Sequence, residues 1–382
     1  MSTITVESTV KRSARVLQVA GMFDVPDPGQ HRLSFEVPHD LSVIENGDWN
    51  VGLIVGPSGS GKSVTAREVF GDAVVGPAPW YEDRAVVDNF PDDMPVKDVV
   101  ALLNSVGFSS PPAWLRPFRV LSVGEQFRVS VARALSDPHY RSLCVMDEFT
   151  STVDRRVAQI GSHAVQRAVR GRGQRFVAVT CHFDVIDWLQ PDWVYRPDSV
   201  DFEWRRLQPH PPVELEVREV GREAWALFRP HHYLSGNLHV AARCACGFVD
   251  EQPVAFQAWY PFPHPRVKDI MAGHRTVVLP DWQGIGLGVR IKDFCAQMIA
   301  EQGYRYRTTL AHPTLLAWHR KSPRWREVGA QNRPSKSRKP KRLQAQHQNP
   351  RKLATRTFEY VPEPGTQVTR SNDTRNTLSV PG

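Results

Sequence analysis

The fold of this chain is restricted above all by one short segment, Gly56–Ser63. Its sequence, Gly-Pro-Ser-Gly-Ser-Gly-Lys-Ser, is a complete G-x-x-x-x-G-K-S phosphate loop. The glycines let backbone N–H groups turn toward phosphate oxygens, and the lysine and final serine supply a positive charge and an Mg²⁺ ligand. An apolar run at 51–55 predicts a strand before the loop, and 64–70 predict a helix after it.

This arrangement predicts an α/β fold that binds a nucleoside triphosphate together with Mg²⁺. The residues predicted to hold the phosphates are Gly56, Pro57, Ser58, Gly59, Ser60, Gly61, Lys62 and Ser63. Ser63 is also the first predicted metal ligand, through its hydroxyl group.

Polar residues follow two later apolar runs, each of which predicts a buried strand. The run at 143–146 ends at Asp147 and Glu148, and the run at 175–180 is followed by His182. A carboxylate at a strand end beside a phosphate loop can hold Mg²⁺ through water, which we assign to Asp147. A second carboxylate can polarise the attacking water, which we assign to Glu148.

The order of the motifs in this half resembles that of the nucleotide-binding domain of the ABC ATPases. Leu-Ser-Val-Gly-Glu-Gln at 121–126 precedes a predicted amphipathic helix at 127–135, and Ser-Thr-Val-Asp at 151–154 follows the carboxylates. The resemblance implies that His182 contacts the γ-phosphate and acts with Glu148 as a catalytic residue. It also implies that Ser122, Gly124 and Glu125 of one subunit close over the ATP of another, which gives a head-to-tail homodimer with two shared sites.

Two departures from the ABC transporters disfavour a role in transport. Their glutamine loop has no counterpart, since 84–92 read Arg-Ala-Val-Val-Asp-Asn-Phe-Pro-Asp, and Asp88 or Asn89 is the nearest substitute. No apolar run reaches the roughly 18–20 residues that cross a bilayer, and the N-terminus has no secretory signal pattern. We therefore expect a soluble, cytoplasmic protein without a membrane partner.

A second glycine-rich loop occurs beyond a predicted linker at 209–212, Pro-His-Pro-Pro. Strands are predicted at 213–220, 238–245, 252–260, 275–279 and 305–311, and helices at 289–302 and 313–319. Between the fourth strand and the first helix lies Gln-Gly-Ile-Gly-Leu-Gly at 283–288, which frees several N–H groups at the positive end of a helix. The sequence thus predicts a second anion-binding cradle.

This second loop resembles the pyrophosphate-binding motif of the GNAT acetyltransferases, which bind acyl-CoA. The resemblance implies that acetyl-CoA or another acyl-CoA is held by Gln283, Gly284, Ile285, Gly286, Leu287 and Gly288. A Rossmann turn looks similar, but the loop comes late in its domain. No acidic residue ends a strand about 20 residues further on, where a ribose ligand would be needed.

The groups that would catalyse acyl transfer are less sharply indicated. Many GNAT enzymes carry a general-acid tyrosine on the helix that matches 314–320, but no tyrosine occurs there. His319 is an alternative acid, although a surface position is expected for it. The segment 228–235 contains His231, His232 and Tyr233, and histidine suits proton abstraction from an amine near neutral pH. An ordinary polar loop remains the alternative interpretation of that segment.

Positive charge is concentrated at the C-terminus. The chain carries a formal net charge of +8, and 331–382 contain eleven Lys or Arg against three Asp or Glu, so the remainder is balanced. Nine basic residues and no acidic one occur between 331 and 356. This composition predicts a disordered tail, either a solubilising segment or an electrostatic arm for nucleic acid.

The predicted layout is therefore an ABC-type ATP-binding domain at 1–208, a GNAT-like acyl-CoA-binding domain at 209–330 and a basic disordered tail at 331–382. The GNAT half also resembles the phage Mom-type DNA-modification proteins in a His-Tyr-x-Ser segment at 232–235, an aromatic run at 259–262 and the Gln-Gly-Ile-Gly loop.

Three hypotheses follow from this layout. In the first, the ATPase engages nucleic acid while the second half modifies a base on it. Alternatively, the acceptor is a protein lysine or a small amine and ATP turnover gates its acylation. In the third, the GNAT half is an inert module that binds CoA or a partner, and only the ATPase turns over.

Overall fold

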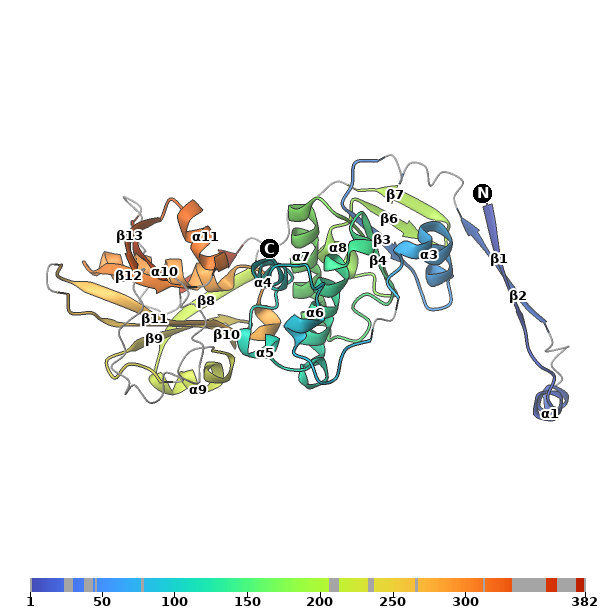
Figure 1. Cartoon of the computed structure of the whole chain (residues 1–382), viewed down its shortest axis with the longest axis horizontal. Helices are drawn as coiled ribbons and strands as arrows, with labels where there is room; N and C mark the ends of the chain where they lie inside the picture. The colour runs from blue at the N-terminus through green and yellow to red at the C-terminus, as the bar shows by residue number, and fades with distance from the viewer. Residues whose placement is uncertain are drawn as a thin grey trace. The chain divides into compact units, whose positions relative to one another are not determined.

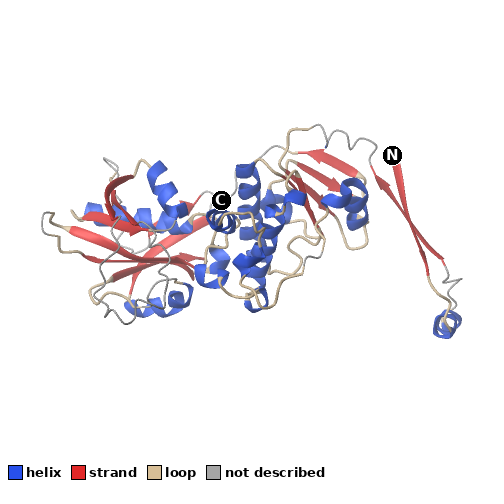
Figure 2. Ribbon diagram, in the orientation of Figure 1, coloured by secondary structure: helices blue, strands red, loops and turns tan. Residues whose placement is uncertain are grey.

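A computed structural model of the chain describes residues 2–23, 30–37, 44, 47–76, 79–205, 213–232, 237–264, 267–311, 313–331, 355–362 and 376–380. Within these residues the fold is α/β, with strands arranged in three sheets (Figures 1 and 2). The chain divides into two compact units, one of residues 1–80 with 130–208 and one of residues 81–129 with 209–382. The predicted break at 208 lies between these units, whereas 81–129 group with the second unit. None of the described helices combines the length and the apolarity that crossing a membrane requires.

The first unit is built on a five-stranded sheet in which four neighbouring strands are parallel and the last is antiparallel. In spatial order the strands are β4 (Leu143–Met146), β5 (Arg175–Thr180), β3 (Val51–Val55), β6 (Trp193–Arg196) and β7 (Asp201–Trp204). Every residue of β3 is buried. Such continuous apolar runs are typical of parallel strands that are covered on both faces.

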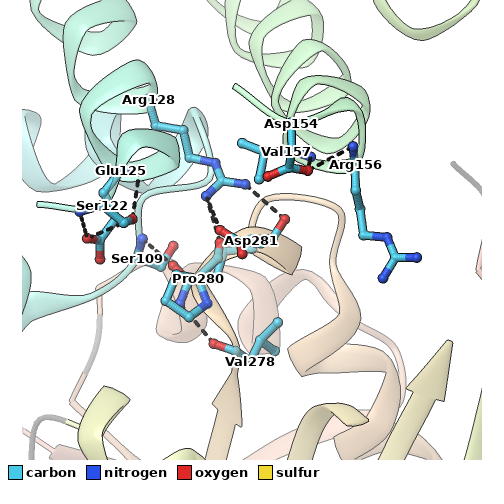
Figure 3. A network of polar contacts seen from close by, with 11 residues as sticks. Ser109, Ser122, Glu125, Arg128, Asp154, Arg156, Val157, Val278, Pro280 and Asp281 are labelled. Carbon is cyan, nitrogen blue, oxygen red and sulfur yellow. Dashed lines mark hydrogen bonds and ion pairs between the residues drawn. The ribbon is translucent and has the colours of Figure 1, made fainter. Parts of the chain in front are cut away.

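Among the described helices of the first unit, α7 has capping residues at both of its ends. Its helices are α3 (Lys62–Phe70), η1 (Gly71–Ala73), η4 (Pro138–Tyr140), α7 (Arg155–Arg172) and α8 (Val185–Leu189). The carboxylate of Asp154 caps α7 by accepting from the N–H groups of Arg156 and Val157 (Figure 3). Gly173 ends the helix in a left-handed conformation, with φ of 64°.

The N-terminal residues of this unit form a two-stranded antiparallel ribbon. Its strands are β1 (Ser2–Thr9) and β2 (Gln30–Val37), and α1 (Ala14–Met22) comes between them in the chain. Helix α6 (Val123–Ser136) spans the division between the two units.

The second unit contains an eight-stranded sheet that is antiparallel except at one pair. In spatial order its strands are β13 (Trp325–Gln331), β14 (Thr355–Tyr360), β12 (Arg305–Leu310), β11 (Ile270–Val278), β10 (Gln252–Pro261), β9 (Arg243–Val249), β8 (Val213–Val220) and β15 (Asn376–Val380). The parallel pairing of β11 with β12 covers only Ile270–Ala272 and Arg305–Arg307. The ladder therefore stops before the end of β11, from which the chain enters the second glycine-rich loop.

The helices of the second unit come from both of its chain segments. From 81–129 these are η2 (Val86–Asn89), α4 (Val96–Ser105), α5 (Pro111–Trp114) and η3 (Phe118–Val120). From 209–382 they are η5 (Arg222–Ala224), α9 (Trp225–Phe228), η6 (Arg229–His231), η7 (Pro280–Trp282), α10 (Leu287–Glu301) and α11 (Pro313–Lys321). Helices α4 and α11 are in contact, so the two segments pack together.

One predicted strand is displaced along the chain. A strand was expected at 238–245, but β9 begins only at Arg243. The N–H of His239 donates instead to Nε2 of His274 at 3.0 Å, and the N–H of Ala241 donates to Nδ1 of His239 at 3.2 Å. Because imidazole nitrogens accept from these backbone donors, the segment does not join the ladder there.

The prediction of a disordered tail over 331–382 is wrong for 355–360, which form β14 between β12 and β13. The side chains of Phe358 and Tyr360 are buried in the sheet. Glu359 is also buried, and it accepts from Arg305 at 2.5 Å and from Arg307 at 2.6 Å. Because the neighbouring residues are basic, the sequence pattern did not reveal this short alternating strand. Guanidinium groups of β12 neutralise the charge of its Glu359. Residues 332–354, with most of the positive charge, lie outside the described residues.

We expect Glu359→Gln to destabilise the protein by about 2 kcal/mol at pH 7, because the guanidinium groups of Arg305, Arg307 and Arg326 lose a charged acceptor. Burial raises the pKa of Glu359, but the hydrogen bonds from Arg305 and Arg307 outweigh burial and lower it overall. The stabilisation is therefore present above pH about 4.5 and is lost as the pH falls through the lowered pKa. Urea unfolding at pH 7 and pH 3 measures the difference, which should shrink in acid. Glu327→Gln, at a more exposed ion pair, is the matched control.

Candidate functional site

The phosphate loop has the conformation that its sequence predicts. Gly59 and Gly61 have φ of 80° and 87°, and α3 begins directly after them at Lys62. A Cβ added at Gly59 would meet no atom within 4 Å, so this part of the loop is open. The Oγ of Ser60 is buried without a hydrogen-bond partner among the described residues. A buried hydroxyl, free N–H groups and a lysine together fit a triphosphate.

Lys62 is already held close to the loop. Its Nζ donates to the carbonyl oxygen of Pro57 at 2.7 Å. Helix α3 has no side-chain cap at Gly61, so the N–H groups of its first turn face outward from the helix end. The local folding of this segment therefore leaves both a cation and backbone donors that fit the β- and γ-phosphates.

The sheet register places the other predicted groups at the same edge as the loop. Val55 lies opposite Thr180, and Met146 lies opposite Ala178. Parallel strands present their carboxyl ends together, so the residues that follow β4 and β5 reach the edge from which the phosphate loop departs. Asp147 and Glu148 follow β4, and His182 follows β5, where its N–H donates to Oγ1 of Thr180 at 3.2 Å.

Glu148 has a backbone conformation that non-glycine residues rarely adopt, with φ of 54°. Asp147 Oδ1 accepts from its N–H at 2.9 Å, and Glu148 Oε2 accepts from Ser151 Oγ at 2.6 Å. Such strain costs about 1–3 kcal/mol and is concentrated at functional sites. The exposed carboxylate of Glu148 is thus held in place by its neighbours, as a base that orients water must be.

The predicted signature segment belongs to the second unit and begins α6. Ser122 and Glu125 form a reciprocal cap, in which Glu125 Oε2 accepts from the N–H and the Oγ of Ser122 at 2.9 and 3.1 Å (Figure 3). Ser122 is exposed and Gly124 is buried.

The side chain of Asn89, one of the two residues considered as a substitute for the glutamine loop, is occupied by local hydrogen bonds. It accepts from the N–H of Tyr81 and donates to the carbonyl of Ala85.

The second glycine-rich loop also has an open, left-handed start to its helix. Gly284 and Gly286 have φ of 98° and 87°. Gly286 is the N-cap residue of α10, and no side chain caps the first N–H groups of that helix. A Cβ at Gly286 would touch only Val289, at 4.0 Å, whereas one at Gly288 would lie 3.3 Å from Val278. The side chains of Ile285 and Leu287 are buried, so these residues offer backbone N–H groups only. This donor set fits a pyrophosphate such as that of acyl-CoA.

Gln283 differs from the other residues of this loop because its side chain is occupied within the protein. Its Oε1 accepts from the N–H of Ser109 at 2.6 Å, and its Nε2 donates to the carbonyl of Val278 at 2.9 Å. The amide therefore fixes the loop against residues of the 81–129 segment. A contact of Gln283 with acyl-CoA remains a prediction, and its main-chain N–H also donates within the protein, to the carbonyl of Pro280 at 3.2 Å.

Of the candidate transfer residues, His232 packs against Trp225, one of the residues that line an open cavity, whereas Tyr233 lies outside the described residues. Neither His231 nor His232 lines this cavity itself. The cavity has a volume of about 520 Å³. Its lining residues are Arg222, Glu223, Trp225, Arg229, Asn237 and Leu238. The ring of His232 meets the ring of Trp225 edge to face, with centroids 5.6 Å apart.

Burial makes His231 a better candidate for a neutral base than an exposed histidine. Desolvation lowers the pKa of His231, and the charges of Glu125 and Asp281 oppose the shift without reversing it. His319 was expected at the surface, and that expectation is wrong, because its side chain is fully buried. Burial lowers the pKa of His319 to about 3, which makes it a poor proton donor near pH 7.

One residue near the second loop was not singled out from the sequence. Arg128 lies in α6 and is completely buried, and it donates to the carbonyls of Pro280 and Asp281 (Figure 3). The sequence shows only an arginine within an amphipathic helical stretch, and that pattern does not identify its partner.

Comparison with family models found no match, and comparison with curated proteins found none. Among solved structures, the ATP-binding cassette of an ABC transporter in its ADP conformation is 18% identical, with 46% of this chain and 82% of that chain covered and a TM-score of 0.31. A dimeric bacterial ABC transporter cassette is 15% identical, with 47% and 90% covered and a TM-score of 0.33. A ribosomal-protein-alanine N-acetyltransferase from Escherichia coli is 11% identical, with 40% and 98% covered and a TM-score of 0.30.

The chain is an α/β protein that carries a phosphate loop in its first unit and a second glycine-rich loop in its second unit. The description rests on the phosphate loop between β3 and α3, and on the glycine-rich loop between β11 and α10. No comparison bears on the Mom-type resemblance.

Proposed function

We propose that this protein is an ATP-hydrolysing homodimer whose second unit transfers an acyl group from acyl-CoA to an amine. The observation that carries the ATPase assignment is the open phosphate loop, with the buried and unpartnered hydroxyl of Ser60, at the sheet edge that also receives Glu148. Ser63 and Asp147 would hold Mg²⁺, and Glu148 would take a proton from the attacking water.

The dimer follows from the presence of one phosphate loop and one signature in each chain. Ser122, at the exposed N-terminus of α6, can donate to a γ-phosphate bound by a second subunit. Binding of ATP would therefore join two chains, and hydrolysis would release them. The signature belongs to the unit that carries the acyl-CoA loop, so closure would act on that unit directly.

The transferase assignment rests on the open N-terminus of α10. The N–H groups at Gly284, Gly286 and Gly288 would hold the pyrophosphate of acyl-CoA, which supplies a thioester carbon that an amine can attack. His231 would accept the proton of the acceptor amine, because burial favours its neutral form.

A nucleic-acid base is the acceptor that we favour, for two reasons. The cavity beside His232 has a volume of about 520 Å³, within the range of small-molecule sites, and two arginines line it. The chain also carries nine basic and no acidic residues between 331 and 356, which suits contacts to phosphates. A protein lysine or small amine is the alternative acceptor, and an inert CoA-binding module is the alternative to transfer.

Mass analysis of nucleosides tests the acceptor. DNA and RNA from cells that express the protein should contain an acylated nucleoside that is missing from cells expressing Lys62→Ala or Gly286→Asp. Because β14 is part of the sheet, the basic segment is tested by replacing Lys336, Arg338, Lys339 and Lys341 with Gln rather than by deletion. Nucleic-acid binding should weaken, and its salt dependence should flatten. Unmodified nucleosides together with an acylated protein would favour the lysine acceptor.

A further inference from the structure

The second glycine-rich loop is tied to the signature helix by buried polar contacts within the second unit. Nη1 of Arg128 donates to the carbonyl of Pro280 at 2.8 Å, and Nη2 donates to the carbonyl of Asp281 at 2.9 Å. The two carbonyls belong to η7, the turn that leads into Gln283 and the acyl-CoA loop. A fully buried guanidinium is costly to remove from water unless its donors are satisfied, so this contact strongly specifies the position of the turn.

A second contact fixes the same turn from the 81–129 segment. The N–H of Ser109 donates to the side chain of Gln283 at 2.6 Å. Gly107 approaches still more closely, since a Cβ there would lie 2.6 Å from the carbonyl oxygen of Gln283. Its φ of 82° likewise requires glycine. The backbone of 107–109 and the start of the acyl-CoA loop therefore cannot move independently without breaking both contacts.

The same helix carries the groups proposed to meet ATP. Arg128 comes four residues after Gly124, one turn along α6. Ser122 and Glu125 cap the first turn of this helix, and Asp281, which Arg128 contacts, lies near enough to His231 to affect its titration. Figure 3 shows Glu125 and Arg128 on α6 and Ser122 just before it, with the guanidinium of Arg128 directed at Pro280 and Asp281.

We propose that Arg128 is a positioning residue that couples engagement of ATP by the signature to the shape of the acyl-CoA loop. This inference rests on the proposed function of both sites. A shift of α6 on ATP binding would move the carbonyls of Pro280 and Asp281, and with them the N–H groups at 284–288. ATP and acyl-CoA would then change each other's affinity by the same factor, because binding linkage is reciprocal.

The test measures the dissociation constant of acetyl-CoA by calorimetry on the full-length protein, with and without a non-hydrolysable ATP analogue and Mg²⁺. In the wild type the analogue should change this constant at least about fivefold, the lower end of common coupling energies. In Arg128→Met the ratio should fall close to one. Arg128→Lys, which keeps one donor group for two carbonyls, should give an intermediate ratio.

Arg133→Met is the matched control, because Arg133 lies on the same helix and donates to the carbonyl of Pro79 rather than to the acyl-CoA loop. It should keep the wild-type ratio. A purely structural role for Arg128 would lower stability and weaken both ligands without changing the ratio, and that result would overturn the inference.

Hydrogen exchange of the wild-type protein tests the same coupling and does not depend on whether the Arg128 variants fold. The analogue should change the protection of amides 284–289 if the coupling exists, and unchanged protection together with an unchanged acetyl-CoA constant would overturn it. Failure of the wild type to bind acetyl-CoA under any condition would instead overturn the proposed transferase function and this inference with it.

Discussion

Glu148→Gln should reduce steady-state ATP hydrolysis by about 100-fold or more, the usual contribution of a positioned general base. Glutamine keeps the shape of the side chain and can still accept from Ser151, but it cannot take a proton from water. ATP binding should persist, since the phosphate loop is untouched. The variant should therefore accumulate as an ATP-bound dimer, measured by phosphate release and by size-exclusion chromatography with light scattering.

Two controls make this result specific. Glu68→Gln changes an exposed carboxylate of α3 and should hydrolyse ATP at the wild-type rate. Lys62→Ala should lose ATP binding, and the double variant with Glu148→Gln should stay monomeric. A Glu148→Gln protein that binds ATP but remains monomeric would contradict the shared-site dimer.

Gly286→Asp should weaken acetyl-CoA binding by about 100-fold or more, because at least two charge-assisted hydrogen bonds are lost. Gly286 is the N-cap of α10, and an aspartate there can itself accept from the first-turn N–H groups while it repels a phosphate. Aspartate tolerates positive φ better than most residues, so folding should be retained. Calorimetry with acetyl-CoA measures the change.

The same helix provides a matched control at its other end. Gly303 has φ of 86° and open space around an added Cβ, much as Gly286 has. Gly303→Asp therefore imposes similar backbone strain, and its charge is placed at the unfavourable end of α10. It should bind acetyl-CoA as the wild type does. Equal loss of binding in both variants would show a stability effect and would count against the assignment of the loop.

The parts of the site that the sequence predicted are those set by local geometry. The phosphate loop needs glycines at positive φ between a buried strand and a helix. These residues are consecutive in the chain, so the sequence alone indicates the loop. The cradle at Gly286 is predictable for the same reason. The strand ends at Asp147 and His182 follow from apolar runs that parallel pairing buries on both faces.

The parts that the sequence did not predict depend on contacts between distant segments. Arg128 and Pro280 are 152 residues apart in the chain, and neither residue type indicates its partner. Gln283 matches a ligand-binding motif, yet its amide bonds to Ser109 within the protein. Strand β14 was not predicted because its flanking residues are basic and polar, while Glu359 obtains its counter-charges from arginines of β12 and β13.

The position of β14 also determines when one edge of the large sheet can form during synthesis. The sheet order places β14 between β12 and β13, although β14 follows both in the chain. Among the described strands, β13 pairs with β14 alone, so β13 has no ladder partner until residue 360 has left the ribosome. Until then the nascent sheet of the second unit presents β12 as an open edge, and such edges are prone to aggregate. Premature termination before residue 355 would therefore yield an incomplete fold rather than a shortened tail.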